Sequence, residues 1–409
     1  MDAMFRKYDV RGVYGSEITP EKFVRLGAAL GLSGKELALG RDYRVHNDAL
    51  GKALLTGYSG TVLDVGVCPT PVLAFAAEKQ GAMLTASHNP PEYAGLKLCI
   101  ERHEATVTEM FSLSEDYDSA VVAPTTPCVE DASGLIQDYC GSLPAFEDGL
   151  YDLGGGAACA LPQKIFPQTL FSKPDPWFGH HSPLPEDATL GALKEATLKR
   201  GKVGFAFDGD GDRMMAVDGG KVVDGGIVTA FLAQKKLKAS ERVVVNIDFR
   251  QDVKEFIEES GFKLTICAVG MNSVYEAAVH TRAKFGAERN GHYLFMDHLP
   301  ASDGFYPAAL LSSEKPGVIA SFAEQFTNEF ITQTRRTSAD LAGIAEACVD
   351  DGAAVETIDG VWADYGDYVL LIRASNTEPL IRINSEARTR ELALAGIKKA
   401  DELIEACKK

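Results

Sequence analysis

Two periodic patterns of apolar and polar residues alternate along the chain. Segments with apolar residues three and four positions apart predict helices, and the short apolar runs between them predict strands. Thr19 and Pro20 predict the start of one helix, because Thr is a favoured N-cap and Pro fits the first helical position. Its apolar face comprises Phe23, Leu26, Gly27 and Leu30, and Gly31 ends it. Helices that alternate with strands indicate an α/β fold.

An apolar run leads into a short segment of acids and arginines at three places along the chain. These segments are 36–44, 203–213 and 242–250. Ligands of open α/β sheets bind beyond the carboxyl ends of the strands, so each segment is a candidate site. We interpret the three as one α/β unit used three times. Three unrelated strands followed by polar loops remain the alternative.

The order of elements changes near the C-terminus. A strand pair around 368–387 precedes a helical pattern, which predicts a smaller α+β domain. The apolar side of this helix is expected to comprise Leu392, Leu394, Ile397, Leu403 and Ile404. The Pro- and Thr-rich segment 123–131 is a predicted linker, and further breaks are expected after 224–226 and near 332–340. The expected domains are 1–128, 129–226, 227–335 and 336–409.

Length and charge narrow the classes of protein. The 409 residues exceed what one hydrophobic core holds and predict two to four domains. A net charge of −17 argues against nucleic acid as the main partner, since that affinity depends on Lys and Arg. No apolar run is long enough to span a bilayer or to form a secretory signal, so we expect no membrane partner and a cytoplasmic location. The scattered cysteines lack metal-ligand spacing and are expected to be reduced thiols.

The segment FAFDGDGDR places three acids next to one another after an apolar strand. Asp208, Asp210 and Asp212 alternate with glycines, and a hard divalent cation would relieve the repulsion between their carboxylates. Arg213 and Gly219 stand where an EF-hand needs Gly and Glu, so that motif is excluded. A hairpin turn built on Asp-Gly is one alternative. The other is a haloacid-dehalogenase-type DxDG loop with Asp208 as nucleophile.

Ser87 follows an apolar strand in the segment AMLTASHNPPEYAGLKL. The Ser-His-Asn-Pro-Pro run predicts a sharp turn that presents the Ser87 hydroxyl, which could act as a nucleophile or as a phosphoryl carrier. A hydroxyl that only stabilises the turn is the alternative. No G-x-S-x-G surrounds Ser87, so a hydrolase elbow is not supported.

Two further segments carry polar side chains suited to a sugar phosphate. The first, IRASNTEPLIRI, has two guanidiniums with hydroxyl and amide groups around a turn, which suits an oxyanion. Its polar residues are Arg373, Ser375, Asn376, Thr377 and Arg382. The second, GAERNGHY, has Glu288, Asn290 and His292 at alternating positions, which suits contacts to sugar hydroxyls. A polar loop without a ligand remains the alternative for each.

These four segments, in this order, resemble the α-D-phosphohexomutase family of phosphomannomutases, phosphoglucomutases and phosphoglucosamine mutases. The resemblance covers nearly the whole chain and also includes FRKYDVRGVYG, GRDYR, PDPWFGHHSPLP and DGFYPAALL. TASHNP together with DGDGDR is its most specific part. The resemblance implies a heart-shaped arrangement of three related mixed-sheet α/β domains and a smaller C-terminal α+β domain.

The resemblance also implies roles for individual residues. Ser87 matches the family's phosphoserine, and it would ligate Mg²⁺ together with Asp208, Asp210 and Asp212. The remaining catalytic positions are Arg11, His88, Lys97 and Arg213. The substrate-binding positions are Tyr8, Glu288, Asn290, His292, Arg373, Ser375, Asn376, Thr377 and Arg382.

The implied activity is interconversion of hexose 1-phosphate and hexose 6-phosphate through phospho-Ser87. The implied cofactors are one Mg²⁺ per chain and a hexose 1,6-bisphosphate, which is both activator and intermediate. The partners would be small hexose phosphates, and the protein is expected to be a monomer or a homodimer. Either Lys97 or His88 could act as the general acid or base.

Two departures from the family pattern fall where the sugar would be read. Asn290 stands where the family has Ser, and Met271 follows Gly270 where a basic or imidazole side chain is common. SNTEP resembles phosphomannomutases and phosphoglucomutases more than the SGTEP of phosphoglucosamine mutases, so mannose and/or glucose phosphates are the expected substrates. Phosphoglucosamine mutase is the alternative, and a non-catalytic sugar-phosphate-binding protein is the alternative of another class.

Overall fold

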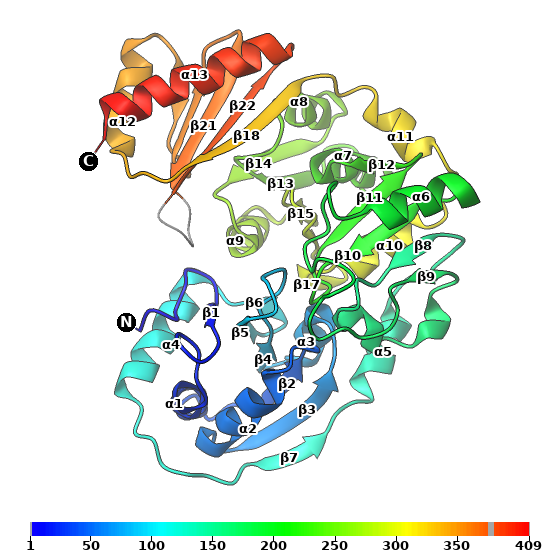
Figure 1. The fold of residues 1–409 in the computed structure, drawn as a ribbon, viewed down its shortest axis with the longest axis vertical. Coiled ribbons are helices and arrows are strands. Elements are labelled where there is room, and N and C mark those ends of the chain that lie inside the picture. Colours follow the sequence, from blue (N-terminus) through cyan, green and yellow to red (C-terminus); the bar gives the residue numbers. More distant parts are fainter. Residues whose placement is uncertain (1, 375–379, 409) are drawn as a thin grey trace. The chain divides into compact units, whose positions relative to one another are not determined.

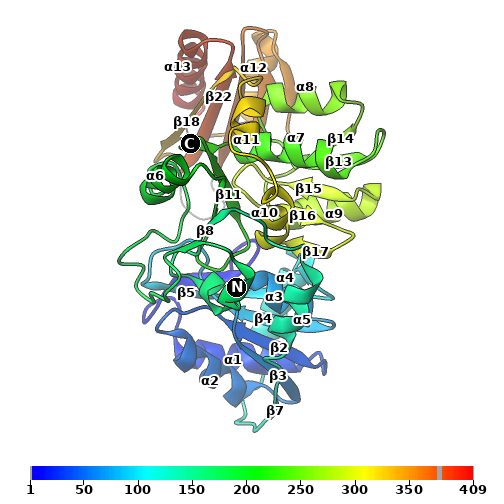
Figure 2. The ribbon, with the colours of Figure 1, turned by 90° about the vertical axis from the view of Figure 1, so that its right-hand side faces the viewer.

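The structure, a computed structural model, describes residues 2–374 and 380–408. Two compact units are formed by Met1–Val228 with Asn290–Ser321 and by Thr229–Arg289 with Phe322–Lys409. Both contain sheets and helices, as Figure 1 and Figure 2 show, and the predicted α/β class with several mixed sheets is confirmed. In the described part of the chain, no helix has the length and apolar character needed to cross a membrane.

A mixed sheet with the order β1-β5-β4-β2-β3-β7 begins the first unit. Its strands are β1 (Val10–Val13), β2 (Leu37–Arg41), β3 (Thr61–Val67), β4 (Gln80–Leu84), β5 (Tyr93–Ile100) and β7 (Cys128–Asp131), and β6 (His103–Glu104) pairs with β5. Strand β2 lies between β3 and β4 and is parallel to both, so its carboxyl end opens beside that of β4. The linker prediction for 123–131 was therefore wrong for Cys128–Asp131, which pairs in parallel with β3 as an exposed edge strand.

Helix α1 (Pro20–Gly31) forms as the sequence predicts. The Thr19 side chain accepts a hydrogen bond from the Lys22 amide at 3.4 Å. Gly27 of α1 and Gly57 of α2 (Asn47–Gly57) bring the two helices into backbone contact. A Cβ at Gly57 would lie 1.8 Å from the Val24 carbonyl oxygen. Close approach, rather than conformational freedom, is what requires these two glycines.

The second sheet of this unit has the order β12-β11-β10-β8-β9. Its strands are β8 (Leu150–Asp152), β9 (Thr169–Leu170), β10 (Gly204–Phe207), β11 (Met214–Asp218) and β12 (Lys221–Val223). Strand β10 is parallel to β8 and antiparallel to β11. The unit also contains the pair β16 (Tyr293–Phe295) and β17 (Leu299–Ser302) and the helices α3 (Thr70–Ala76), α4 (Val107–Ser119), α5 (Leu135–Ser142), α6 (Gly191–Arg200), α10 (Phe305–Leu311) and α11 (Val318–Ala323).

The second unit contains a parallel group and an antiparallel sheet. Strand β13 (Arg242–Asn246) is parallel to β14 (Lys263–Cys267) and β15 (Phe285–Ala287), and helices α8 (Gln251–Glu259) and α9 (Met271–Thr281) follow β13 and β14. Helix α7 (Gly225–Lys236) leads into this group. The antiparallel sheet comprises β18 (Glu329–Arg335), β22 (Ile381–Ala387), β21 (Tyr368–Ala374), β20 (Val361–Asp364) and β19 (Ala354–Glu356), in that order.

Helices α12 (Leu341–Asp350) and α13 (Arg390–Ala406) cover one face of the antiparallel sheet (Figure 1). Ile397, Leu403 and Ile404 of α13 are buried as predicted, but Leu394 is 46% exposed and its prediction was wrong. Helix α13 lies so close to the sheet that a Cβ at Gly396 would be 2.2 Å from Ser385 Oγ. The buried face of α13 comprises Ala393, Gly396, Ile397, Ala400, Leu403 and Ile404, and Leu394 lies off it.

The contact between α1 and α2 gives a test of the fold. Gly57→Ala places a methyl group inside the backbone of α1, and overpacking of this kind lowers the free energy of unfolding by about 1–3 kcal/mol. Gly141→Ala in α5 is the matched control, because nothing lies within 4 Å of its Cβ. Urea unfolding of both variants measures the difference, and equal stabilities would contradict the close packing.

Candidate functional site

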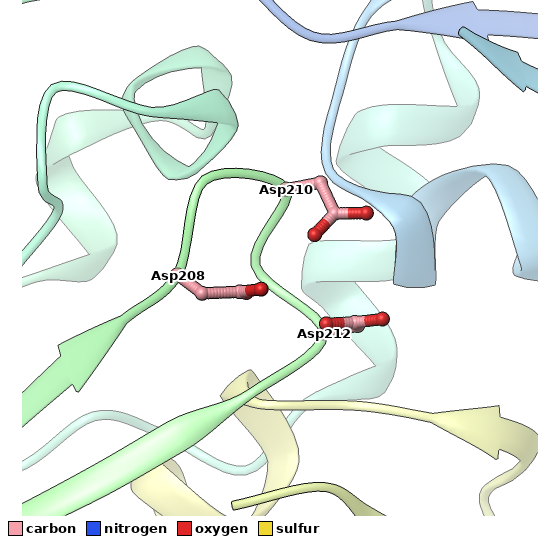
Figure 3. A group of neighbouring side chains, drawn as sticks. All are labelled: Asp208, Asp210 and Asp212. Atoms are coloured by element: carbon pink, nitrogen blue, oxygen red, sulfur yellow. The ribbon is translucent and has the colours of Figure 1, made fainter. Parts of the chain in front are cut away.

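The acidic loop 208–213 connects the antiparallel strands β10 and β11. The hairpin interpretation is therefore correct for the backbone, yet the three carboxylates converge as the metal interpretation requires (Figure 3). Asp208, Asp210 and Asp212 are buried and offer oxygens that lie within 4.8 Å of one another. In residues 2–374 and 380–408, this is the sole group of three or more His, Cys, Asp or Glu side chains that could hold a metal ion.

Two glycine contacts hold the acidic loop against its surroundings. A Cβ at Gly209 would lie 2.4 Å from the Ser87 carbonyl oxygen, so only glycine allows this approach. A Cβ at Gly156 would lie 2.7 Å from the Gly209 carbonyl oxygen, which accepts a hydrogen bond from the Ala157 amide at 2.9 Å. The glycine-rich segment after β8 thus packs against the backbone of the acidic loop and stabilises it.

Lys97 offsets part of the negative charge of the loop. Its Nζ lies 2.8 Å from Asp210 Oδ2 and also contacts Asp212 Oδ2. Burial opposes its charge, but these carboxylates hold the pKa of Lys97 well above its usual range. Burial, followed by the charges of Asp212 and Asp210, holds the pKa of Asp208 well above its ordinary value. Burial and mutual repulsion thus oppose full ionisation of the cluster at Asp208.

The donor set fits a hard divalent cation. All three ligand groups are carboxylates, the type that Mg²⁺ prefers. Asp210 is completely buried, and its Oδ1 has no hydrogen-bond partner within residues 2–374 and 380–408. A buried acceptor without a partner is costly, and a bound cation would satisfy it.

Ser87 lies directly against this cluster. Its Oγ donates a hydrogen bond to Asp208 Oδ2 at 3.0 Å. Its φ of 49° is in the left-handed region, which a non-glycine residue adopts only when its surroundings hold it there. Its Oγ is also 3.2 Å from His88 Nδ1. The predicted turn therefore presents the Ser87 hydroxyl to the acids.

Arg213 connects two imidazoles of the site. Its Nη2 lies 3.0 Å from His88 Nδ1, and its Nε donates to His292 Nε2 at 3.1 Å. The positive charge of Arg213, followed by burial, holds the pKa of His88 well below its usual range. Asn290 Oδ1 lies 2.9 Å from His292 Nδ1, so a proton on Nδ1 satisfies both ring nitrogens of His292. Asn290, a departure from the family pattern, thus orients His292.

Arg11 reaches the same turn from β1. Its Nη1 donates to Asn89 Oδ1 at 2.7 Å, two residues beyond Ser87, and its Nη2 contacts Asp9. Tyr8 packs beside Lys7, whose Nζ lies 4.9 Å from the centre of its ring. The structure therefore joins Arg11 to the Ser87 turn.

The predicted residues of the second unit form a separate polar network. Glu288 is buried and accepts hydrogen bonds from Asn246 Nδ2 at 2.9 Å and from the Gly270 amide at 2.7 Å. Arg373 is 5% exposed, and its Nη2 lies 3.2 Å from Asp359 Oδ2. Among the described residues, the Nε of Arg373 has no hydrogen-bond partner, which suits an additional anion.

Arg382 is the other predicted residue of this region that lies among the described residues. Arg382 stands opposite Arg373 in the β21–β22 ladder and is exposed. Ser375, Asn376 and Thr377 lie outside the described residues.

Sequence reasoning missed several supporting residues. Thr70 donates from Oγ1 to Asp210 Oδ2 at 2.6 Å, a contact across 140 positions that no local pattern signals. Asp359 forms an ion pair with Arg373 and also accepts a hydrogen bond from the Val269 amide at 3.1 Å. Arg44 binds the turn that carries Ser87, and its place in the GRDYR segment was the only available signal.

Family models match three parts of the chain. Models described as phosphoglucomutase/phosphomannomutase alpha/beta/alpha domain I and domain III match residues 2–117 and 225–315. The model of the phosphoglucomutase/phosphomannomutase C-terminal domain matches residues 330–401.

Individual relatives align with almost the full chain. A Methanocella arvoryzae protein named "Probable phosphoglucosamine mutase" is 30% identical, with 99% of this chain and 98% of the relative covered. A Thermococcus kodakarensis protein named "Phosphoglucomutase/phosphomannomutase" is 29% identical, with 99% of each covered. A solved structure of a phosphoglucomutase/phosphomannomutase family protein from Burkholderia thailandensis has the same fold, with a TM-score of 0.85, 24% identity and coverage of 99% and 98%.

Fold and relatives together define a sugar-phosphate mutase. The chain belongs to the α-D-phosphohexomutase family, as the sequence resemblance indicated. Because its relatives are mutases, the chain is an enzyme, and the interpretation as a non-catalytic binding protein is set aside. The same matches place the chain in this family and not among the haloacid dehalogenases.

The contact between Gly209 and Ser87 predicts a loss of activity on a small change. Gly209→Ala would push the acidic loop away from the Ser87 turn, and a shift of about 1 Å at a reacting centre costs on the order of a hundredfold in rate. Gly191→Ala, whose Cβ meets nothing within 4 Å, is the matched control. Turnover of hexose phosphates measures the effect, and a fully active Gly209→Ala enzyme would contradict the close approach.

Proposed function

We propose that the chain interconverts the 1-phosphate and 6-phosphate of a hexose, mannose and/or glucose, through a phosphoserine at position 87. The observation that carries this proposal is the contact of Ser87 Oγ with Asp208 Oδ2 at 3.0 Å inside a buried acidic cluster. A hydroxyl that only stabilised its own turn would not require contact with a carboxylate cluster on a hairpin more than a hundred residues away in the sequence. A phosphate on that hydroxyl, by contrast, would share a cation with them.

Asp208, Asp210 and Asp212, together with an oxygen of phospho-Ser87, would hold one Mg²⁺. When bound, the ion neutralises charge on the phosphoryl group during transfer. Lys97 contacts two of the acids and would remain beside the site as a second positive charge. Thr70 and the Gly209 backbone keep the acids in position.

The proposed reaction consists of two phosphoryl transfers. In the first, the bond between phosphorus and Ser87 Oγ breaks while a bond forms between phosphorus and the free hydroxyl oxygen of the hexose monophosphate. The sugar hydroxyl loses its proton, and Ser87 Oγ gains one, which gives a 1,6-bisphosphate. In the second transfer the other phosphate moves to Ser87. His88, 3.2 Å from Ser87 Oγ, and Lys97 are the candidate groups for these proton transfers.

The substrate's other phosphate must be held while the first reacts. We assign this task to Arg373 with Ser375, Asn376 and Thr377, because Arg373 is buried and its Nε has no hydrogen-bond partner in the described part of the chain. Glu288 would accept hydrogen bonds from sugar hydroxyls. Since the bisphosphate turns round between the two transfers, these contacts must accept either end of the sugar.

Phosphoglucosamine mutase activity is the second candidate. It is favoured by the relative of that name, which is 30% identical over nearly the whole chain. Both candidates share the phosphoserine and differ only in the sugar.

The phosphoserine proposal is tested at Ser87 itself. Ser87→Ala removes the phosphoryl acceptor, so turnover of every hexose phosphate should fall to background, and intact mass should show no phosphate after incubation with a hexose 1,6-bisphosphate. Ser119→Ala, at the exposed end of α4, is the control and should keep both properties. Wild-type turnover in Ser87→Ala would overturn the proposal.

The substrate is decided by parallel assays. Mannose 1-phosphate, glucose 1-phosphate and glucosamine 6-phosphate are compared by kcat/KM under identical conditions. We expect the first two to be preferred, and a preference for glucosamine 6-phosphate would assign the second candidate.

Mg²⁺ should stabilise the fold through the acidic cluster. Binding at a hundred times Kd adds about 2.7 kcal/mol to the free energy of unfolding, so the unfolding midpoint should rise with Mg²⁺ concentration. Asp208→Asn should lose this rise, whereas Asp116→Asn in α4 should keep it. A midpoint that does not respond to Mg²⁺ in the wild-type protein would contradict the metal assignment.

A further inference from the structure

A buried arginine binds the turn that carries Ser87. The side chain of Arg44 is fully buried and uses all five of its N–H groups. Nη2 donates to the carbonyl oxygens of Ser87 at 2.8 Å and Asn89 at 2.6 Å. Nη1 donates to those of Pro90 at 2.7 Å and Tyr93 at 3.2 Å. One guanidinium thus ties together four backbone carbonyls of a single turn.

The fifth N–H connects Arg44 to a carboxylate. Arg44 Nε lies 3.2 Å from Asp42 Oδ2, and Asp42 is itself buried after β2. Asp42 Oδ1 accepts hydrogen bonds from the Arg44 amide at 2.9 Å and from Asn47 Nδ2 at 2.6 Å. With this many donors, neither member of the ion pair can move independently.

Thr85 closes the network on the other side of Ser87. Its Oγ1 donates a hydrogen bond to Asp42 Oδ2 at 2.7 Å and accepts one from the Ser87 amide at 2.8 Å. The Ser87 amide is therefore held through Thr85, and the Ser87 carbonyl is held by Arg44. Both connections end on Asp42, which makes a closed ring of Asp42, Thr85, Ser87 and Arg44.

The ring holds the backbone of Ser87, which is in an unfavourable conformation. A φ of 49° is unfavourable for serine, and local contacts must hold it. The Ser87 carbonyl also lies where the acidic loop approaches most closely, at Gly209. If the backbone relaxed, the Ser87 hydroxyl would turn relative to Asp208.

We propose that Thr85, Asp42 and Arg44 are positioning residues for phosphoryl transfer. The ring that they form with Ser87 holds the Ser87 backbone in its left-handed conformation, and this conformation directs Ser87 Oγ toward the acidic cluster. This inference rests on the proposed role of Ser87 as phosphoryl carrier. None of the three ring residues contacts the sugar in this assignment. Their loss should therefore affect transfer and spare substrate affinity.

The test compares Thr85→Val with Thr85→Ser. Valine keeps the shape of threonine and removes the hydroxyl, whereas serine keeps the hydroxyl and loses a methyl group. Thr56→Val, at an exposed position of α2, is the control for the same chemical change. Intact mass first establishes that each enzyme carries its phosphate, so that kcat reports transfer and not loading.

We expect kcat of Thr85→Val to fall about a hundredfold, as for a misplaced reacting group, with KM within twofold of wild type. Thr85→Ser should keep kcat within a few-fold. Wild-type kcat in Thr85→Val, or a raised KM with unchanged kcat, would overturn the inference. If Thr85→Val does not fold, the same kcat and KM measurements are made on Arg44→Lys. Lysine keeps the positive charge but cannot donate hydrogen bonds to four carbonyls. Failure of both to fold would assign the ring to stability alone and overturn the positioning role.

Ser87→Ala, assayed beside these variants, separates the two proposals. If it turns over like wild type, the phosphoserine proposal fails and the ring loses its purpose. If it is inactive while Thr85→Val has wild-type kcat, only the positioning role fails.

Discussion

Three buried carboxylates on one short hairpin are the constraint on which the rest of the site depends. Asp208, Asp210 and Asp212 repel one another, and burial makes that repulsion stronger than it would be in water. Lys97 offsets part of the charge, but Asp210 Oδ1 has no hydrogen-bond partner among the residues that the structure describes. A divalent cation would resolve the imbalance, and the proposed phosphate on Ser87 would lie beside it.

The surroundings of the acidic loop keep a reactive hydroxyl within reach of that charge. Gly209 lets the Ser87 backbone come close, and the ring of Asp42, Thr85 and Arg44 holds that backbone in a conformation that serine does not favour. Because phosphoryl transfer depends mainly on positioning and electrostatics, a rigid support of this kind suits the proposed chemistry. In the second unit, the buried Glu288 and Arg373 are the polar groups proposed to bind sugar hydroxyls and phosphate.

Local chemistry decided what could be predicted from the sequence. Helix α1 was predictable because its cap and its apolar period are local, and the Ser87 turn and acidic loop were predictable because their residue types are unusual together. Contacts between distant segments were not predictable. Thr70 meets Asp210 across 140 positions, and Leu394 is exposed because it lies off the face of α13 that packs on the sheet at Gly396. Strand β7 was taken for a linker because it ends a segment rich in Pro and Thr, and its pairing with the distant β3 leaves no local signal.

The central claim is that the phosphate on Ser87 and the cation in the acidic cluster touch each other. Mn²⁺ in place of Mg²⁺ makes this directly measurable, since electron–nuclear double resonance detects ³¹P within bonding distance of the ion. A ³¹P coupling typical of direct phosphate coordination, present in the phosphorylated enzyme and absent after dephosphorylation, is the predicted result. Phosphorylated enzyme that binds Mn²⁺ at the three acids without any such coupling would contradict the claim.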